Sequence, residues 1–501
     1  MDGKSTHDVR TGSVTACLLF ITVGLLLYVI SRRRAGIPPG PARWPIIGGM
    51  GAFFGKDPFT AFKSLHQKYG DMFSIYIGSE LAIVLNGYKT INEALVMKGR
   101  TFSRRPVTRF SRLMLKDVSL VFENGVNWKR HRHFALTALH ELCFKGGNGS
   151  TLEDRIQEEL VHFTKKLEDY KEPVDLNDII TLSFSNVMYN VIHGRRAGYD
   201  NEKFRWYVEF QESEQKEFCK HQLMHYCFPF LIMLPFDVLN TKRAVKFSAK
   251  LKEYFDEICA ENFSNYKEGD RNCLIDLWLT AVKSSSCLDQ ENLWKIINEL
   301  MAAGSETTAT AFKWILLCLA RYPDVQSSLR NHIKDNIGDR AVTLSDKNRL
   351  VYARAIILEV LRFGNVVPLG IPHSVSEDFM FNGYLIPKNT SIIPNIASVN
   401  LDSDTFSEPM KFKPERFLTE DRTALLKPER LIPFSLGPRS CLGETIAKSE
   451  LFLYVTTLVQ QFEISQVESD PLPDLVGDFG LTNRPPNYKV QLTKLGEQLV
   501  Q

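Results

Sequence analysis

One cysteine near the C-terminal end of the chain has the surroundings that a reactive thiolate needs. Cys441 lies in PFSLGPRSCLGE, residues 433–444, with Gly437 and Gly443 on its two sides and Arg439 two positions before it. A thiolate exists at neutral pH where a helix N-terminus, backbone N–H donors or a metal ion lowers the thiol pKa. The glycines permit a tight turn and a close approach, and a helix with an apolar stripe is predicted directly after the loop. We therefore expect the positive end of that helix to face the sulfur.

A second group of chemically useful residues lies in MAAGSETTAT, residues 301–310. The segment is predicted to be helical, although glycine in mid-helix costs about 1 kcal/mol relative to alanine. Ala303 and Gly304 would let the helix pass close to a flat ligand. Thr307 can donate to a carbonyl one turn earlier, and Glu306 supplies a titratable group for relaying protons. From these residues alone, a solvated acid beside a β-branched helix residue is the favoured interpretation.

Two further pairs have helical spacing. Trp128 and Arg132 in WKRHR stand at i and i+4, so the indole N–H and the guanidinium share one helix face. Glu359 and Arg362 in LEVLR stand at i and i+3, and Arg416 follows in KPERF. Taken alone, an i, i+3 pair is usually a surface ion pair worth under about 1 kcal/mol.

The loop around Cys441 fits the pattern FxxGxRxCxG, and through it the chain resembles the cytochrome P450 family. The resemblance runs from the N-terminal anchor to the neighbourhood of Val490. It implies that Cys441 is the axial thiolate ligand of a heme b iron, that Arg439 pairs with a heme propionate and that Phe434 covers the proximal side. Pro438 departs from the basic residue often found at its position, a departure that would weaken docking of a redox partner but touches no heme ligand.

The same resemblance assigns roles to the other segments. Trp128 and Arg132 match the family's WxxxR helix on the propionate side, and Arg105 in FSRRP and His373 in GIPHS match further propionate-side positions. Three charged residues match the family's buried structural clamp behind the heme loop, namely Glu359, Arg362 and Arg416.

The segment AGSETT matches the family's oxygen-activation motif AGx(E/D)TT. Ala303 and Gly304 are then heme contacts. Glu306 and Thr307 are the implied catalytic pair, which delivers protons during oxygen activation.

The implied reaction is the insertion of one oxygen atom from O₂ into a lipophilic substrate by a heme-thiolate monooxygenase. No dinucleotide-binding glycine motif is found between a strand and a helix, so a separate NADPH-cytochrome P450 reductase must supply electrons, with a microsomal b-type cytochrome as a second partner. Lys129, Arg130 and Lys448 would steer an acidic partner to the thiolate side. Two rivals stay open: a heme-thiolate isomerase or dehydratase of lipid peroxides, and a non-enzymatic membrane-tethered carrier of lipophiles.

The substrate class follows only from likeness. Residues 361–378, LRFGNVVPLGIPHSVSED, resemble family 2 members, especially vitamin D 25-hydroxylases and related fatty-acid hydroxylases. The expected substrates are sterols or secosteroids, fatty acids, or xenobiotics. By the same analogy, apolar segments line the pocket, as lipophilic ligands require. These are Thr108–Phe122, Phe218–Phe236, Asn298–Thr307, Val366–Ile371 and Phe479–Thr482.

The N-terminal end predicts a membrane anchor. Residues Val14–Ile30 form an uncharged run that is followed by arginines at 32–34. With its flanking serines the run reaches the length of a bilayer core, and the positive charge after it favours a cytosolic body. No cleavage site of small residues precedes the arginines, which disfavours a signal peptide. We predict an anchor with a single transmembrane helix at 1–35, a proline-rich hinge at 36–45 and a heme-binding catalytic domain at 46–501, at the endoplasmic reticulum membrane.

Composition excludes other classes of function. The 501 residues carry 61 basic and 58 acidic side chains, a formal charge of +3, whereas nucleic-acid-binding proteins concentrate basic charge far more. We therefore expect no nucleic-acid partner. The nine cysteines show no CxxC spacing, as is typical of a reducing compartment.

The elements that position these residues are mostly helices. Helical patterns cover Trp128–Leu142, Leu152–Tyr170, Val245–Tyr266, Leu293–Ala320 and Glu444–Phe462. Alternating patterns predict hairpins over Ser74–Tyr88 and Phe379–Pro394, the latter with an Asn-Gly turn. The predicted fold class is mostly α with small β-sheets, the cytochrome P450 fold.

Overall fold

The computed structural model describes residues 22, 32–107, 119–145, 150–228, 241–284, 293–426 and 428–496. The predicted membrane helix, Val14–Ile30, lies outside these residues apart from Thr22. Within the described part, no helix has both the length and the apolar character that a bilayer span requires. Parts of two expected pocket walls, 108–118 and 229–236, also lie outside the described residues.

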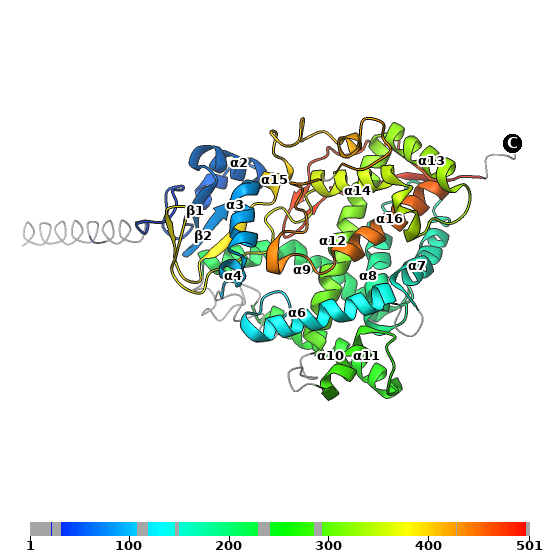
Figure 1. Ribbon diagram of the computed structural model, residues 1–501, viewed down its shortest axis with the longest axis horizontal. Coiled ribbons are helices and arrows are strands. Elements are labelled where there is room, and N and C mark those ends of the chain that lie inside the picture. Colours follow the sequence, from blue (N-terminus) through cyan, green and yellow to red (C-terminus); the bar gives the residue numbers. More distant parts are fainter. Residues whose placement is uncertain are drawn as a thin grey trace, which may run out of the picture.

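Helices make up most of the body, and the sheet of β1 and β2 stands at one end of it (Figure 1). The longer helices are α2 (Pro58–Tyr69), α6 (Gly125–His140), α7 (Leu152–Leu167), α8 (Asn177–His193), α9 (Glu202–Cys227), α10 (Thr241–Asn265), α11 (Leu274–Ser284), α12 (Leu293–Arg321), α13 (Pro323–Ile337), α14 (Val351–Phe363) and α16 (Glu444–Gln461). The shorter ones are η1 (Met50–Phe53), α3 (Tyr88–Asn92), η2 (Glu93–Met97), α4 (Gly99–Phe102), η3 (Glu141–Lys145), η6 (Leu344–Asn348), α15 (Ala397–Asn400), η7 (Pro414–Phe417) and η8 (Gly437–Arg439). Each of the long helices predicted from periodicity is present, and α12 and α16 begin at the predicted residues.

Local sequence explains several helix boundaries. Thr151 and Asp154 form a capping box at the start of α7, each side chain bonding the other's backbone N–H. Pro323 opens α13, where its missing N–H is not needed. Gly194 ends α8 in the left-handed conformation, φ 78°, which glycine adopts without steric cost.

The strands form small sheets. They are β1 (Met72–Ile77), β2 (Glu80–Leu85), β3 (Phe379–Phe381), β4 (Tyr384–Ile386), β5 (Ser391–Pro394), β6 (Phe462–Ser465), β7 (Asp478–Phe479), β8 (Asn483–Arg484) and β9 (Gln491–Lys494). Among the described residues, the sheet order is β1-β2-β5, with separate pairs β3-β4, β6-β9 and β7-β8. A mostly helical fold with small sheets is therefore confirmed.

The second predicted hairpin is shorter than expected. β3 and β4 pair antiparallel across Asn382 and Gly383, which both have positive φ, 49° and 81°, as a tight two-residue turn requires. The rest of the predicted segment leaves the hairpin as β5, which pairs parallel with β2 from Ala82 opposite Ser391. The alternation of apolar and polar residues could not predict this pairing, because the pattern in β5 is the same whether it pairs with β4 or with β2.

The hinge segment packs on the body. Ser74 on β1 donates its backbone N–H to the Pro39 carbonyl at 2.7 Å, and its hydroxyl reaches the Pro38 carbonyl at 2.7 Å. A Cβ at Gly40 would lie 1.8 Å from the Ser74 carbonyl oxygen, so glycine is what allows this contact. Residues 36–45 thus run along the edge of the first sheet.

Helix α12 crosses the middle of the helical part (Figure 1) and packs against α8, α10, α14 and α16. Phe312 on it is fully buried, with its ring centroid 5.3 Å from that of Phe184 on α8 and 5.5 Å from that of Tyr454 on α16. Burying an aromatic side chain of this kind contributes about 1.5–3 kcal/mol. Helix α12 is therefore packed on several sides. The side chains on its remaining face are consequently held in fixed positions.

Candidate functional site

A cavity of about 310 Å³ lies between α12 and the loop that precedes α16. Its wall is mainly apolar, with Leu300 and Ala311 from α12, Leu361 from α14 and Val366 from the segment after α14. A volume and lining of this kind are typical of small-molecule sites. Nine of the predicted site residues line it: Arg105, Arg132, Ala303, Gly304, Thr307, His373, Phe434, Arg439 and Cys441.

The backbone of the cysteine loop is determined by one glycine. Gly437 has φ 76°, and a Cβ there would lie 1.8 Å from the Leu95 carbonyl oxygen. The Cys441 N–H donates to the Phe434 carbonyl at 3.0 Å, which closes the loop and aims the sulfur into the cavity. Pro438 lies against α4, where a Cβ on Gly99 would be 2.9 Å from its ring.

The sulfur faces groups that favour its ionised form. Burial and, less strongly, the Glu444 carboxylate raise the pKa of Cys441, while the backbone N–H groups of Gly443 and Glu444 and the Arg132 guanidinium oppose that rise. The N–H groups belong to the start of α16, so the positive helix end faces the sulfur. Cys441 is exposed through the cavity, where a metal ion could take the thiolate as a ligand and remove the proton outright.

Three arginines form a cationic cradle in the cavity wall, namely Arg105, Arg132 and Arg439. Arg105 Nε and Arg439 Nη1 both donate to the Val121 carbonyl, at 3.1 and 3.3 Å, and Arg132 Nη2 donates to the Ser440 carbonyl at 2.7 Å. Within the described part of the chain, no carboxylate forms an ion pair with any of the three. Burial and mutual repulsion lower the pKa of Arg105 to about 9 and that of Arg439 to about 8. Buried cations gathered without an anion fit an anionic ligand.

Trp128 extends the cradle beneath the cavity wall. The guanidinium carbon of Arg439 lies 3.6 Å from the centroid of the Trp128 ring, a close cation–π contact. The indole Nε1 is buried and has no hydrogen-bond partner among the described residues. An unpaired buried N–H costs about 1–3 kcal/mol, a cost that an anionic oxygen in the cradle would remove.

His373 presents its other ring nitrogen to the same region. Its backbone exchanges hydrogen bonds of 2.7 Å with Ile392 on β5, and Nδ1 lies 2.7 Å from the Phe102 carbonyl, so Nδ1 carries the proton. Burial, followed by repulsion from Arg105 and Arg439, holds the pKa of His373 well below its usual value.

On α12, Thr307 and Ala303 face the cavity together. The Thr307 hydroxyl donates to the Ala303 carbonyl at 2.7 Å, one turn earlier, as its position predicted. Gly304 also lines the cavity, but a Cβ there would lie 2.7 Å from the sulfur of Met188 on α8. The glycine therefore serves the close crossing of α12 and α8 as well as the cavity.

Glu306 points away from the cavity. Its Oε1 accepts from Arg484 Nε at 2.7 Å and from the Thr310 hydroxyl at 3.0 Å, and its side chain is buried. Consecutive residues on a helix point about 100° apart, so Glu306 and Thr307 cannot share a face. Two residues of the expected pocket wall also lie elsewhere. The Thr482 hydroxyl donates to Glu306 Oε1 at 3.4 Å, and the Phe479 ring packs edge-on against Phe59.

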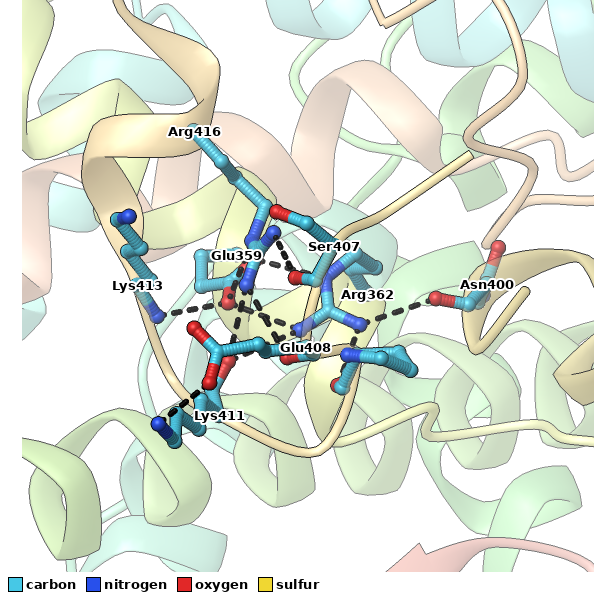
Figure 2. Close-up of polar contacts among 9 residues, drawn as sticks. Glu359, Arg362, Asn400, Ser407, Glu408, Lys411, Lys413 and Arg416 are labelled. Atoms are coloured by element: carbon cyan, nitrogen blue, oxygen red, sulfur yellow. Dashed lines mark hydrogen bonds and ion pairs between the residues drawn. The ribbon is translucent and has the colours of Figure 1, made fainter. Parts of the chain in front are cut away.

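The three clamp residues lie together behind the site (Figure 2). Both oxygens of Glu359 accept from Arg362, at 2.7 and 2.9 Å, and Oε1 also accepts from Arg416 Nε at 3.1 Å and from the Lys413 N–H at 2.8 Å. The Glu359 and Arg362 side chains are fully buried. Arg362 further donates to the Asn400 carbonyl at 3.1 Å. The cluster ties α14 to the loops that follow it, and the same helix presents Leu361 to the cavity.

Two residues at the site were not singled out from the sequence, although Glu299 falls within the expected pocket segment Asn298–Thr307. Glu299 lines the cavity and Arg484 pairs with Glu306. Glu299 stands four and eight positions before Ala303 and Thr307, so helical spacing places all three on one face and would have found it. Arg484 carries no local signal, because its partner lies far away in the chain.

The donor set fits an iron porphyrin on three counts. Cys441 supplies a thiolate for the metal, the cradle and the unpaired Trp128 N–H supply donors for two carboxylates, and the apolar wall suits the ring.

Comparison with known proteins agrees with this geometry. The sequence model of the cytochrome P450 family matches residues 38–492. The chain is 33% identical to cytochrome P450 2U1 of Mus musculus over 98% of this chain and 97% of that protein. It is 32% identical to cytochrome P450 2C3 of Oryctolagus cuniculus, over 95% and 97%, and 31% identical to cytochrome P450 2B2 of Rattus norvegicus, over 94% and 98%. The chain belongs to the cytochrome P450 family and is a heme b-dependent monooxygenase with a lipophilic substrate.

Proposed function

We propose that this monooxygenase hydroxylates a sterol or secosteroid, a fatty acid, or a xenobiotic, with electrons supplied from NADPH by a separate reductase. The observation that carries the proposal is the apolar cavity that holds Cys441 on one wall and Thr307 on another. Bound heme supplies the activation of O₂ and the oxidation of an unactivated C–H bond. The chain supplies the ligand, an apolar chamber and a proton donor.

We further propose that Thr307 holds a proton in the cavity. Its hydroxyl is tied to the Ala303 carbonyl at 2.7 Å and can release that contact to donate toward the substrate side. In this proposal Glu306 is the source that resupplies the proton. Its carboxylate would have to leave Arg484, at 2.7 Å, before it could reach the Thr307 side of the helix.

The proposed reductase docks on the face behind Cys441. Lys129 and Arg130 are exposed on α6, the helix whose Arg132 donates to the Ser440 carbonyl at 2.7 Å. Exposed cations beside the metal ligand would steer an acidic partner, either the reductase or a microsomal b-type cytochrome. Lys448 already pairs with Glu444 at 2.6 Å, so we assign most of the steering to α6.

The proposed location is the endoplasmic reticulum membrane, with one anchoring helix and the catalytic domain in the cytosol. Apolar side chains are exposed at the end of the hinge and just after it, with Trp44 61%, Ile46 57% and Phe54 71% exposed. Large exposed apolar residues gathered near one end of a body are typical of a membrane-facing surface. Arginines at 32–34 precede them and would meet anionic headgroups.

The test is a ligand screen followed by turnover. Ferric holoprotein is titrated with representative sterols, secosteroids and fatty acids, and displacement of the water on iron is read from the Soret band. Ligands that bind are then incubated with reductase, NADPH and ¹⁸O₂. One labelled oxygen atom in the product supports the proposal. A rearranged product without label would indicate the isomerase or dehydratase, and binding without NADPH-dependent product would indicate the carrier.

A further inference from the structure

One carboxylate on α12 holds the segment that passes over the cavity. We call residues 119–123 the strap. Glu299 Oε1 accepts from the Ser119 hydroxyl, and Oε2 accepts from the N–H groups of Leu120 and Val121, at 2.6 and 3.0 Å. Hydrogen bonds to an ionised acceptor are about twice as strong as neutral ones. Among the described residues, the hydrogen bonds that join the strap to α12 therefore converge on the Glu299 side chain.

The far side of the strap is fastened to the arginine cradle. The Val121 carbonyl accepts from Arg105 Nε and Arg439 Nη1, at 3.1 and 3.3 Å, and the Glu123 carbonyl accepts from Arg439 Nη2 at 2.5 Å. The peptide groups of Val121 thus link the two sides: its N–H donates to Glu299, and its carbonyl accepts from Arg105 and Arg439. Chains of hydrogen bonds through peptide groups polarise and strengthen one another.

The electrostatics of Glu299 depend on the same contacts. Burial raises the pKa of Glu299 to about 7, while the donors Ser119, Val121 and Leu120 act to lower it, and the nearby Glu123 carboxylate raises it further. Above that pKa the side chain is ionised, and the strap then stabilises the carboxylate just as the carboxylate holds the strap.

From this geometry we infer that Glu299 is a positioning residue for heme retention. It holds the strap against α12 so that Val121 and Glu123 keep Arg105 and Arg439 aimed at the propionates. The order of the strap above the substrate cavity and the retention of heme then depend on the same hydrogen bonds. The inference rests on heme binding and is independent of the identity of the substrate.

The experiment measures heme release from the holoprotein to excess apomyoglobin, followed in the Soret region. Glu299→Gln keeps the shape of the side chain but removes its charge, so the strap N–H groups keep only a neutral acceptor and the NH₂ group faces the Ser119 hydroxyl. We expect release about tenfold faster than in the parent protein, because hydrogen bonds to a charged acceptor are stronger than those to a neutral one. Glu299→Asp keeps the charge and should restore the rate to within about threefold of the parent.

The matched control is Asn298→Ala on the same helix. Asn298 accepts from Gln211 at 2.9 Å and faces α9 rather than the strap, so its loss should leave heme release unchanged. A second readout is hydrogen exchange of the strap peptide in the heme-loaded proteins, which should rise in Glu299→Gln and not in Asn298→Ala. If both variants change both readouts alike, Glu299 is only a general packing residue and the inference is wrong.

A double variant tests the route through Val121. Arg105→Lys removes the planar donor that reaches the Val121 carbonyl. If Glu299 acts through the cradle, Glu299→Gln with Arg105→Lys should release heme little faster than the faster single variant, because coupled residues are not additive. Release rates that multiply would show two independent effects and would overturn the inference.

Discussion

The guanidinium of Arg439 lies over the indole of Trp128, with its central carbon 3.6 Å from the ring centroid. The two side chains come from a C-terminal loop and from α6, and Arg439 also lines the cavity. Arg439 is held by backbone carbonyls and the indole N–H is left without a partner among the described residues. The pair therefore offers one charge and one spare donor, which in our proposal serve a heme propionate.

Trp128→Phe tests the spare donor. The substitution keeps an aromatic face for Arg439 and removes only the N–H, so we expect heme to transfer to apomyoglobin about tenfold faster. Trp278→Phe is the matched control, because Trp278 Nε1 is also buried and unpartnered in the described structure but packs against Phe134 outside the cavity. Equal effects of the two substitutions would contradict a propionate contact.

Cys441→Ser should abolish the red-shifted CO band that thiolate ligation gives to reduced heme, since an alcohol is a far weaker donor to iron. The measurement is the CO difference spectrum of the reduced protein. Cys143→Ser is the control: Cys143 is buried, and burial raises its pKa to about 12, so the band should persist. A thiolate-type band in Cys441→Ser would show that another residue is the ligand.

Thr307→Ala should keep heme but separate electron consumption from product formation. Loss of the hydroxyl removes the proton donor that faces the cavity, so reduced oxygen leaves as peroxide. The ratio of peroxide to consumed NADPH should rise severalfold over that of the parent. Thr456→Ala removes an equivalent back-bond, of 2.7 Å to the Phe452 carbonyl, at a remote site and should leave that ratio unchanged. Unchanged coupling in Thr307→Ala would remove this residue from proton delivery.

Glu359→Gln should lower the free energy of unfolding by about 3–5 kcal/mol, because it leaves the buried charge of Arg362 without its partner. Urea unfolding followed by circular dichroism measures the loss. The position of the CO band in the folded fraction should stay the same, since the cluster touches no cofactor atom. Glu408→Gln breaks only the exposed pair with Lys411 and should leave the unfolding midpoint in place.

The buried His193 side chain should make the folded protein less stable in acid. Burial, with a contribution from Arg195, lowers its pKa from 6.5 to about 3. Between these values the unfolded chain binds a proton that the folded chain does not, so stability falls as pH drops below 6.5, by about 2 kcal/mol at pH 5. His193→Gln cannot titrate and should flatten this part of the curve of urea midpoint against pH. An identical slope in the variant would exclude His193 as the cause.

Much of the site can be predicted from residues that are close together along the chain. The FxxGxRxCxG loop encodes its own geometry, because Gly437 needs a positive φ and α16 starts directly after it. The periodic stretches predicted α12 and α16 from their first residues. The sequence did not predict which distant residues these side chains contact. Nothing near Glu306 indicates Arg484, and nothing near Glu299 indicates the strap.

What the sequence determined by itself is therefore the family, the thiolate loop and the helices, since each depends on residues that are neighbours along the chain. The tertiary structure decided which way each helix face turned. Glu306 faces Arg484 while Thr307 faces the cavity, β5 joined β2 instead of its own hairpin, and Val121 came to lie between Glu299 and the arginines. These outcomes depend on contacts between distant segments, whose packing no local pattern of residues contains.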